Sequence, residues 1–385
     1  MASPALTPTT PATRDVVLVP PAIAMVWTGA GRPHEIVAVP GVVLGAGETL
    51  VAIELATVCG SDVHTVEGHR AAPAPLVLGH EYVGRVIEVA DGVRAVDGAH
   101  VQVGDRVVWS IMASCRECDR CRRGLPQKCR AVLKYGHERI QTHWELTGGF
   151  ATHAHLRAGT AIVRVGESLR AEVLAPAACG GATAWAALAR ADEVADVDGA
   201  TVLILGAGLI GLSACAMATD RGATVVVADP DPARRALAVR FGAAQVADPR
   251  DVRALTAALA ATGSPEYDIV LEASGSPRAV QAALEVVGVG GVVVLVGSVF
   301  PTEPLPVDPE RLVRGLITIR GVHNYAPRDL DAAVRYLRDR GAARPFEELV
   351  SARYPLAQID QALAAASAGR AVRVGVDPRD AHRRC

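Results

Sequence analysis

The chain has 385 residues, a length that suggests two or three domains at about 150 residues per domain. Hydrophobic residues make up 50% and charged residues 21%, which is a globular rather than a disordered composition. The 39 basic and 41 acidic residues leave a formal net charge of −2. Composition therefore gives no electrostatic basis for binding nucleic acid or an anionic membrane surface.

The N-terminal segment is rich in Pro, Thr and Ala and lacks the basic region and apolar run of a signal peptide. We expect residues 1–22 to be a disordered tail and the protein to be cytoplasmic, where its eight cysteines serve metal or thiol chemistry rather than disulfides. Uncharged stretches at 173–189, 201–219 and 286–302 contain glycines and lack basic flanks. Buried strands explain these stretches better than membrane spans.

The first part of the chain, from residue 26 to about 108, contains short β-branched runs separated by Gly, Pro and Asp turns. This pattern predicts an all-β, barrel-like unit. Its strands are expected at 51–55, 82–89 and 105–110, with further strand signals between 149 and 165.

From about residue 171 the pattern changes to alternating strands and helices, which is typical of βαβ units and predicts an α/β fold. The expected strands are 201–205, 224–228, 269–273 and 292–297, and the expected helices include 232–241 and 278–286. A helix at 326–339 and a strand at 372–376 follow in a mixed pattern, as expected if the chain returns to its first domain.

Four cysteines fall within one loop, in the pattern C-x2-C-x2-C-x7-C: Cys115, Cys118, Cys121 and Cys129. Four thiolates at this spacing close a tetrahedral shell around zinc and leave no position for a substrate. An iron–sulfur cluster is a competing interpretation, although the ferredoxin pattern continues into a Cys-Pro pair that is missing here. We interpret the loop as a structural zinc site that stabilises a segment with little core of its own.

A second, open metal site is suggested by Cys59, His80 and Cys179, two thiols and one imidazole that leave one coordination position free. Asp62 can orient the His80 ring through its second nitrogen. Ser61 can take a proton from a bound alcohol, and the nearby His64 can pass that proton to solvent. The competing interpretation is that these are ordinary core residues.

A nucleotide site is indicated by Gly206, Gly208 and Gly211, a G-x-G-x-x-G pattern directly after an apolar strand and before an apolar helix. In this context bare backbone amides and a helix N-terminus accept a pyrophosphate. Asp229 ends the next strand, where a carboxylate binds the adenosine ribose and repels a 2′-phosphate, which favours NAD over NADP. The alternative role for Asp229 is a helix N-cap.

Together the open site, the cysteine loop and the glycine motif, in this order, resemble the zinc-dependent medium-chain alcohol dehydrogenase family over residues 26–376. The resemblance implies a GroES-like β-barrel catalytic domain, at 23–178 and 323–385, and a doubly wound parallel-sheet Rossmann domain at 179–322. It implies two zinc ions per chain, NAD as cofactor, an alcohol or aldehyde substrate, and a homodimer or homotetramer joined through the strand at 292–296 and residues 298–301.

The resemblance also assigns roles to individual residues. Cys59, His80 and Cys179 become the catalytic zinc ligands, Ser61 and His64 the proton relay, and Glu81 the acidic residue beside the metal. On the cofactor side it points to Arg234 near the adenosine, Thr183 near the nicotinamide, Arg373 at the pyrophosphate, and Gly297, Ser298 and Val299 at the carboxamide. Arg234 and Arg373 could equally be solvated surface arginines.

The substrate is suggested by the segments around residues 134–149, 297–301 and 319–325, which resemble a subgroup associated with phosphonate catabolism. An anionic substrate needs cationic donors near the zinc, and the candidates are Lys134, His137, Arg139 and His323. Alternatives are a polyol, amino-alcohol or simple-alcohol dehydrogenase, and a non-catalytic protein that binds NAD and zinc. Of the two other cysteines, Cys215 is expected in the core and Cys385 has no assigned role.

Overall fold

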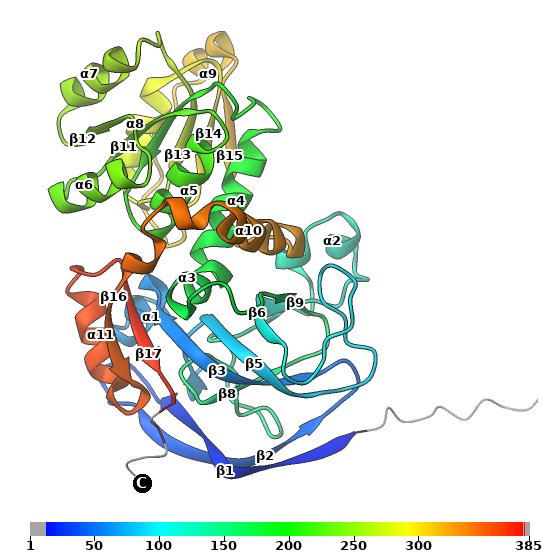
Figure 1. Ribbon diagram of the computed structural model, residues 1–385. Helices are drawn as coiled ribbons and strands as arrows, with labels where there is room; N and C mark the ends of the chain where they lie inside the picture. The colour runs from blue at the N-terminus through cyan, green and yellow to red at the C-terminus, as the bar shows by residue number, and fades with distance from the viewer. Residues whose placement is uncertain (1–12, 380, 382–385) are drawn as a thin grey trace, which may run out of the picture.

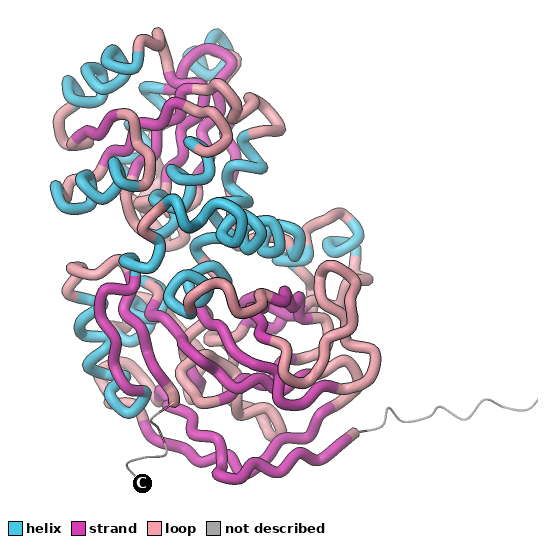
Figure 2. Tube along the Cα trace, viewed as in Figure 1, coloured by secondary structure: helices cyan, strands magenta, loops and turns pink. Residues whose placement is uncertain are grey.

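The computed structural model describes residues 13–379 and 381, which form two lobes (Figure 1). The lower lobe is built mainly of strands, whereas helices flank the strands of the upper lobe (Figure 2). Cys385 and residues 1–12 lie outside the described residues. Among the described residues, no helix has the length and apolarity needed to cross a membrane.

The lower lobe contains two sheets that enclose an apolar core. The smaller sheet has the order β2-β1-β4, with β1 (Arg14–Trp27), β2 (Glu35–Leu44) and β4 (Leu76–Val77). The larger sheet has the order β16-β17-β3-β5-β6-β7. Its members are β16 (Val350–Pro355), β17 (Arg373–Asp377), β3 (Thr49–Val58), β5 (Glu81–Val89), β6 (Arg106–Ala113) and β7 (Leu133–Lys134), with β8 (His153–Leu156) paired to β3 and β9 (Thr160–Arg164) to β6.

The expectation of a disordered tail over residues 1–22 is wrong for its second half. Residues 14–22 belong to β1, which pairs antiparallel with β2 and with β4. The tandem prolines Pro20 and Pro21 interrupt the β1–β2 register, because proline has no amide hydrogen to donate. Pairing resumes at Ala22, whose side chain is fully buried.

The upper lobe is a parallel six-stranded sheet with the order β12-β11-β10-β13-β14-β15, the arrangement of a doubly wound dinucleotide-binding fold. Its strands are β10 (Thr201–Leu205), β11 (Thr224–Ala228), β12 (Gln245–Ala247), β13 (Tyr267–Glu272), β14 (Val287–Leu295) and β15 (Thr318–Gly321). The strand expected at the subunit interface, residues 292–296, corresponds to β14, which pairs with β13 on one side and β15 on the other. The edge strand of this sheet is therefore β15.

Helices cover both faces of this sheet, which explains why its strands are apolar throughout (Figure 1). Along β10, Val202 and Ile204 join one core while Leu203 and Leu205 join the core on the opposite face. The helices of the upper lobe are α4 (Gly180–Ala191), α5 (Leu209–Thr219), α6 (Pro232–Arg240), α7 (Val252–Thr262), α8 (Pro277–Val286) and α9 (Pro309–Gly315). Cys215 of α5 is fully buried in this core, as expected.

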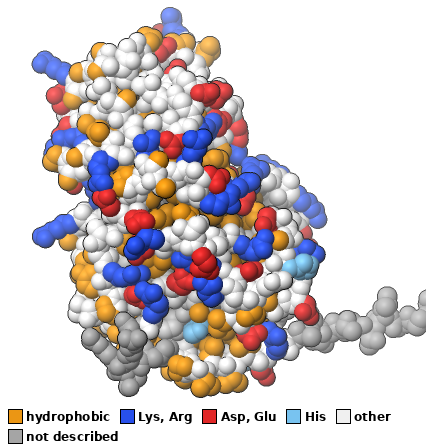
Figure 3. Space-filling model, in the orientation of Figure 1, with side chains coloured by type: hydrophobic (Ala, Val, Ile, Leu, Met, Phe, Trp, Pro, Cys, Tyr) orange, Lys and Arg blue, Asp and Glu red, His pale blue; other side chains and the backbone are white. Residues whose placement is uncertain are grey.

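The chain returns to the lower lobe after β15, so that β16 and β17 extend a sheet begun by β3. Between β15 and β16, α10 (Pro327–Arg340) packs against α4 at the junction of the lobes (Figure 1). The other helices of the lower lobe are α1 (Gly60–Val66), α2 (Asp119–Arg122), α3 (Ala171–Leu174) and α11 (Ile359–Ser367). Acidic and basic side chains alternate over the visible surface without a continuous field of one sign (Figure 3).

Candidate active site

Three potential metal ligands meet at the junction of the lobes, as the sequence predicts. The ligand atoms of Cys59, His80 and Cys179 all lie within 4.8 Å of one another. Cys59 follows β3, His80 precedes β5, and Cys179 stands immediately before α4. Two thiols and one imidazole are a catalytic zinc donor set, and a fourth position remains for a substrate oxygen.

Asp62 holds two of these ligand segments in place. Its buried carboxylate accepts hydrogen bonds from the backbone amides of Cys59 (2.9 Å) and Gly79 (3.2 Å). The same carboxylate lies 3.4 Å from Nδ1 of His80, which leaves Nε2 of that ring to face the metal position. Asp62 therefore fixes the backbone beside two of the predicted ligands, and its predicted role in orienting His80 towards a metal stays a prediction.

Neighbouring groups shift the pKa values of two of the three potential ligands, Cys59 and His80. A hydrogen bond from the Cys179 thiol and the positive charge of Arg373 hold the pKa of Cys59 well below its usual range, although burial opposes this. Burial alone would lower the pKa of His80, but the charges of Asp62 and Cys59 raise it. An anionic sulfur beside an imidazole is the electronic environment that a divalent cation requires.

Glu81 is fully buried behind the metal ligands and is paired with Arg373. The guanidinium of Arg373 donates to both carboxylate oxygens of Glu81, at 2.7 and 2.9 Å, and the Thr57 hydroxyl donates a third hydrogen bond at 2.6 Å. Burial raises the pKa of Glu81 to about 7 even though Arg373 opposes the shift. Arg373 also lies 3.8 Å from Sγ of Cys59. The pyrophosphate contact expected of Arg373 stays a prediction.

The four cysteines of the loop also come together. The Sγ atoms of Cys115, Cys118, Cys121 and Cys129 lie within 4.8 Å of one another, and none of the described cysteines forms a disulfide. Cys115 and Cys129 are 3.4 Å apart, and Cys118 and Cys129 are 4.0 Å apart. Zinc–sulfur bonds of about 2.3 Å place tetrahedral thiolates about 3.8 Å apart, so the set fits one ion. Thiolates that ligate separate irons of a cluster stand farther apart, which disfavours the iron–sulfur alternative.

The glycine motif forms the tight turn between β10 and α5. Gly206 has φ +105°, in the region that favours glycine. A Cβ on Gly211 would meet the carbonyl oxygen of Gly206 at 1.9 Å, so only glycine allows the helix to approach the strand here. Gly208 is the N-cap of α5, whose first amides are free to bind an anion.

The second strand places Asp229 beside this turn. Its carboxylate accepts hydrogen bonds from the backbone amides of Ala207 (2.7 Å) and Asp231 (2.9 Å). The N-cap of α6 is Asp231, so the alternative N-cap role of Asp229 is excluded. Arg234 donates to the carbonyl of Ala207, at 3.4 Å, and therefore lies against the glycine turn; its expected contact with the adenosine stays a prediction.

The three potential metal ligands line a pocket between the lobes, and this pocket has a volume of about 270 Å³. The lower lobe contributes Ser61, His64, Arg70, Lys134 and His137, among others. The upper lobe contributes Thr183 and the carboxyl ends of β13 and β14, including Gly297 and Val299. Ser298 instead donates a hydrogen bond to the buried carboxylate of Glu272, at 3.2 Å, and lines a neighbouring hollow.

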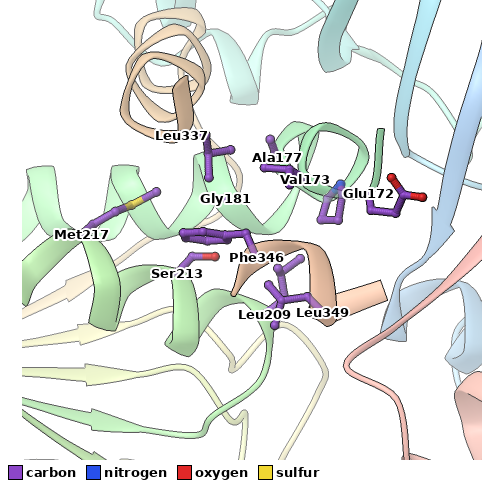
Figure 4. A pocket seen from close by; sticks show the side chains of 11 residues that line it. Glu172, Val173, Ala177, Gly181, Leu209, Ser213, Met217, Leu337, Phe346 and Leu349 are labelled. Carbon is purple, nitrogen blue, oxygen red and sulfur yellow. The ribbon is translucent and has the colours of Figure 1, made fainter. Parts of the chain in front are cut away.

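Another hollow, between α3, α4 and α5, is a packing defect rather than a ligand site. It is lined by apolar side chains such as Met217, Leu337 and Phe346 (Figure 4). Its volume of about 10 Å³ is no larger than one water molecule requires.

Sequence comparison agrees with this geometry. Residues 45–167 match the alcohol dehydrogenase GroES-like domain, and residues 210–339 match the zinc-binding dehydrogenase family. A geraniol dehydrogenase from Castellaniella defragrans is 33% identical over 350 residues, which cover 85% of this chain and 89% of that protein. The chain belongs to the zinc-dependent medium-chain alcohol dehydrogenases. The phosphonate-associated subgroup is not confirmed by these matches.

Other members of the family support the same assignment. An L-threonine 3-dehydrogenase from Streptomyces avermitilis is 31% identical, over 88% of this chain and 94% of that one. The crystal structure of an alcohol dehydrogenase from Thermotoga maritima superposes with a TM-score of 0.87, at 31% identity, over 93% of this chain and 99% of that one. The GroES-like and Rossmann domains expected from the sequence are therefore confirmed.

The pocket of this dehydrogenase carries positive charge that the sequence located only in part. Nζ of Lys134 donates to Oδ1 of Asn324 at 3.0 Å, and Arg70 lies 3.5 Å from Nε2 of His137. Burial, with the charges of Lys128 and Arg70, lowers the pKa of Lys134 to about 8. Burial and the neighbouring cations lower the pKa of His323 to about 4. Arg70 was missed because it comes from a segment outside these motifs, and Asn324 was not selected because, although it lies in the 319–325 segment, it carries no charge.

Of the predicted substrate residues, His137 reaches the pocket but as a neutral side chain. Burial and the charges of His80 and Arg70 hold its pKa well below the usual range, and its Nδ1 lies 2.7 Å from the carbonyl of Gly136. Arg139 is exposed and is not among the residues that line the pocket, so its selection as a substrate contact is corrected. Arg139 was selected because it is cationic, but the sequence around it does not indicate whether its side chain faces the pocket or the solvent.

Proposed function

We propose that this chain is an NAD(H)-linked alcohol dehydrogenase and aldehyde reductase whose substrate carries an anionic group, such as phosphonoacetaldehyde and its alcohol. One observation supports this proposal above all. An open Cys–His–Cys set, the Rossmann strand ends and the ammonium group of Lys134 face one pocket. Zinc, when bound, would supply a Lewis acid at Cys59, His80 and Cys179, and the nicotinamide would accept the hydride.

The proton is handled by two residues of α1. Oγ of Ser61 lies 3.3 Å from Nε2 of His80, at the edge of the metal position. Ser61 would accept the proton of the substrate hydroxyl at Oγ, and His64 would pass it to solvent from the same helix face, three residues on. In the reducing direction the same two residues return the proton to the product alcohol.

The buried Glu81–Arg373 pair has a positioning role. Arg373 engages both oxygens of Glu81, so that carboxylate would reach the metal only by giving up these hydrogen bonds. We propose that Arg373 helps to keep the ligand Cys59 anionic, and that its ion pair with Glu81 leaves neither charge unpaired in the buried surroundings of the metal pocket.

We propose NAD rather than NADP as the cofactor. Asp229 stands at the end of β11 with its carboxylate against the glycine turn, where it would accept a ribose hydroxyl and repel a 2′-phosphate. Arg234 lies beside the same turn and would contact the adenosine portion. Thr183, Gly297, Ser298 and Val299 are proposed for the nicotinamide half, since Thr183, Gly297 and Val299 line the pocket and Ser298 lies between Gly297 and Val299.

The anionic substrate is supported by two cationic side chains of the pocket. Lys134 and Arg70 line it, whereas none of the described residues that line it carries a carboxylate. A charged donor of this kind recognises a phosphonate or carboxylate strongly when half-buried. An amino alcohol is the second candidate, since an L-threonine 3-dehydrogenase is among the relatives.

We further propose a structural zinc on the four-cysteine loop, which gives two zinc ions per chain, and a cytoplasmic homo-oligomer. The close, unbridged thiols support the zinc and a reducing compartment. At the open edge of the Rossmann sheet, Ile319 of β15 is exposed, as are Val313 and Leu316 nearby. These exposed apolar side chains support a contact between subunits at this edge.

The proposed function is tested by initial rates of NADH oxidation with phosphonoacetaldehyde and with uncharged aldehydes of similar length. We expect a strong preference for the phosphonate. Equal turnover of charged and uncharged aldehydes would reject the anionic substrate while leaving the dehydrogenase chemistry intact. A faster reaction with amino-alcohol substrates would select the second candidate.

A further inference from the structure

A third group of side chains that can ligate a metal includes one residue that lines the active-site pocket, His64. His64, in the last turn of α1, and Glu67 and His69, in the turn that follows, have ligand atoms within 4.8 Å of one another. None of these residues belongs to either cysteine site. Two imidazoles and one carboxylate form a donor set that zinc uses in proteins.

The spacing of this cluster fits one small divalent ion. Nδ1 of His69 lies 3.4 Å from Oε2 of Glu67. Ligand bonds of about 2.1 Å in a tetrahedral shell place neighbouring donor atoms about 3.4 Å apart. The rings of His64 and His69 have centroids 5.7 Å apart, and the side chain of His69 is exposed, so its rotation would bring a ring nitrogen towards His64.

Neighbouring residues orient the cluster. The other oxygen of Glu67, Oε1, accepts a hydrogen bond of 2.5 Å from the hydroxyl of Ser367 on α11. A ligand carboxylate held by a second hydrogen bond is typical of metal sites. The His64 ring packs against Phe300 with a centroid separation of 4.4 Å. The nearest cation in sequence, Arg70, extends towards His137 in the pocket and not towards the carboxylate of Glu67.

The cluster is accessible to ions from solvent. The side chain of His69 is 65% exposed and that of Glu67 is 37% exposed. His64 is half-buried and lines the same pocket as Ser61, His80 and Cys179. An ion that reaches this cluster from solvent would therefore bind His64, the residue proposed to pass the proton to solvent.

We propose that His64, Glu67 and His69 form a third divalent-metal site, for zinc or a similar borderline ion, and that its occupation inhibits the dehydrogenase. Inhibition follows because a metal-bound imidazole nitrogen has no lone pair left to carry a proton. The inhibition rests on the proposed relay role of His64, whereas the binding site itself does not.

Equilibrium dialysis of the zinc-loaded holoenzyme against increasing free Zn²⁺ tests the site without reference to activity. The variants are His69→Ala and Glu67→Ala, with His100→Ala as the control, since His100 is also an exposed histidine but lies elsewhere. We expect wild type and His100→Ala to bind one more zinc than either cluster variant. Ser367→Ala should weaken that additional zinc by about tenfold, the smaller effect typical of an outer-shell partner.

Initial rates measured over the same zinc series test the inhibition. We expect a saturable loss of activity in wild type and His100→Ala, with the midpoint shifted at least tenfold upwards in His69→Ala. Identical zinc stoichiometry in wild type and both cluster variants would overturn the site, as would loss of the additional zinc in His100→Ala. An additional zinc that leaves the rate unchanged would confirm the site and overturn both the inhibition and the relay role of His64.

Discussion

Replacing Lys134 by methionine removes the ammonium group from the pocket while nearly preserving the length of the side chain. Nζ of Lys134 already donates to Asn324 and lies among the residues that surround the metal ligands. We expect Lys134→Met to weaken turnover of an anionic substrate and to leave turnover of a neutral aldehyde nearly unchanged. The difference between the two substrates isolates the charge from any general damage to the site.

The size of the loss follows from the half-buried position of Lys134. Two unit charges about 4 Å apart attract by about 4 kcal/mol at an effective dielectric constant near 20. Solvent at the pocket mouth reduces this, so a charge-assisted hydrogen bond of about 1.5–3 kcal/mol is the better guide. The corresponding loss in kcat/KM is roughly 10- to 150-fold.

Arg139→Met is the matched control, because Arg139 lies five residues further on but is exposed and outside the pocket. We expect its kcat/KM for phosphonoacetaldehyde to stay within about twofold of wild type, as for most surface substitutions. Equal losses in Lys134→Met and Arg139→Met would refute the reasoning, as would equal losses for anionic and neutral substrates.

The same lysine predicts a pH dependence. Because burial lowers the pKa of Lys134 to about 8, the group is charged below this pH and neutral above it. The ratio of kcat/KM for an anionic aldehyde to that for a neutral one should therefore fall as pH rises through about 8. A sulfonate is the suitable anion, since its own charge does not change in this range. The ratio should be flat in Lys134→Met, and a fall that persists in this variant would assign the titration to another group.

Three further substitutions test the metal and cofactor sites. Cys118→Ser should remove one zinc per chain and lower the melting temperature, because the cysteine loop loses the metal that cross-links it. Zinc analysis and thermal unfolding measure both effects, and an unchanged zinc content would contradict the prediction. Asp62→Asn should weaken catalytic zinc binding by about 10- to 100-fold in chelator competition, since it loses the charge beside His80; equal affinity would show that the carboxylate charge does not matter. Asp229→Gly should raise the ratio of kcat/KM for NADP to that for NAD, and an unchanged ratio would remove the basis for preferring NAD.

Local patterns predicted the fold best where both faces of an element are covered. The strands at 201–205 and 224–228 have the predicted bounds because their apolar runs end at the glycine turn and at Asp229. The first strand was missed because tandem prolines and a Thr-rich start resemble a disordered tail. Its stability comes from pairing with β2 and β4, contacts that local composition does not encode.

The site residues were likewise easier to predict where they are close together in the sequence than where the fold brings distant segments together. The four-cysteine cluster was predictable because all its ligands lie in one loop. Cys59, His80 and Cys179 were suggested by their residue types, but they are so far apart in the sequence that the competing interpretation as core residues stayed open until the family resemblance was added. Arg70 approaches His137 across 67 residues, and no periodicity indicates that contact. The His64, Glu67 and His69 cluster was present in one short segment, but a loose His and Glu pattern is common on surfaces and gave no signal by itself.

We propose that Cys59, His80 and Cys179 hold the catalytic zinc of a dehydrogenase whose second zinc is structural. The most direct measurement compares zinc content and NAD-linked turnover in the dialysed wild-type protein and in Cys179→Ser. We expect two zinc ions per chain in wild type, one in the variant, and loss of turnover in a variant that remains folded. A Cys179→Ser protein that retains both zinc ions and full turnover would contradict the assignment.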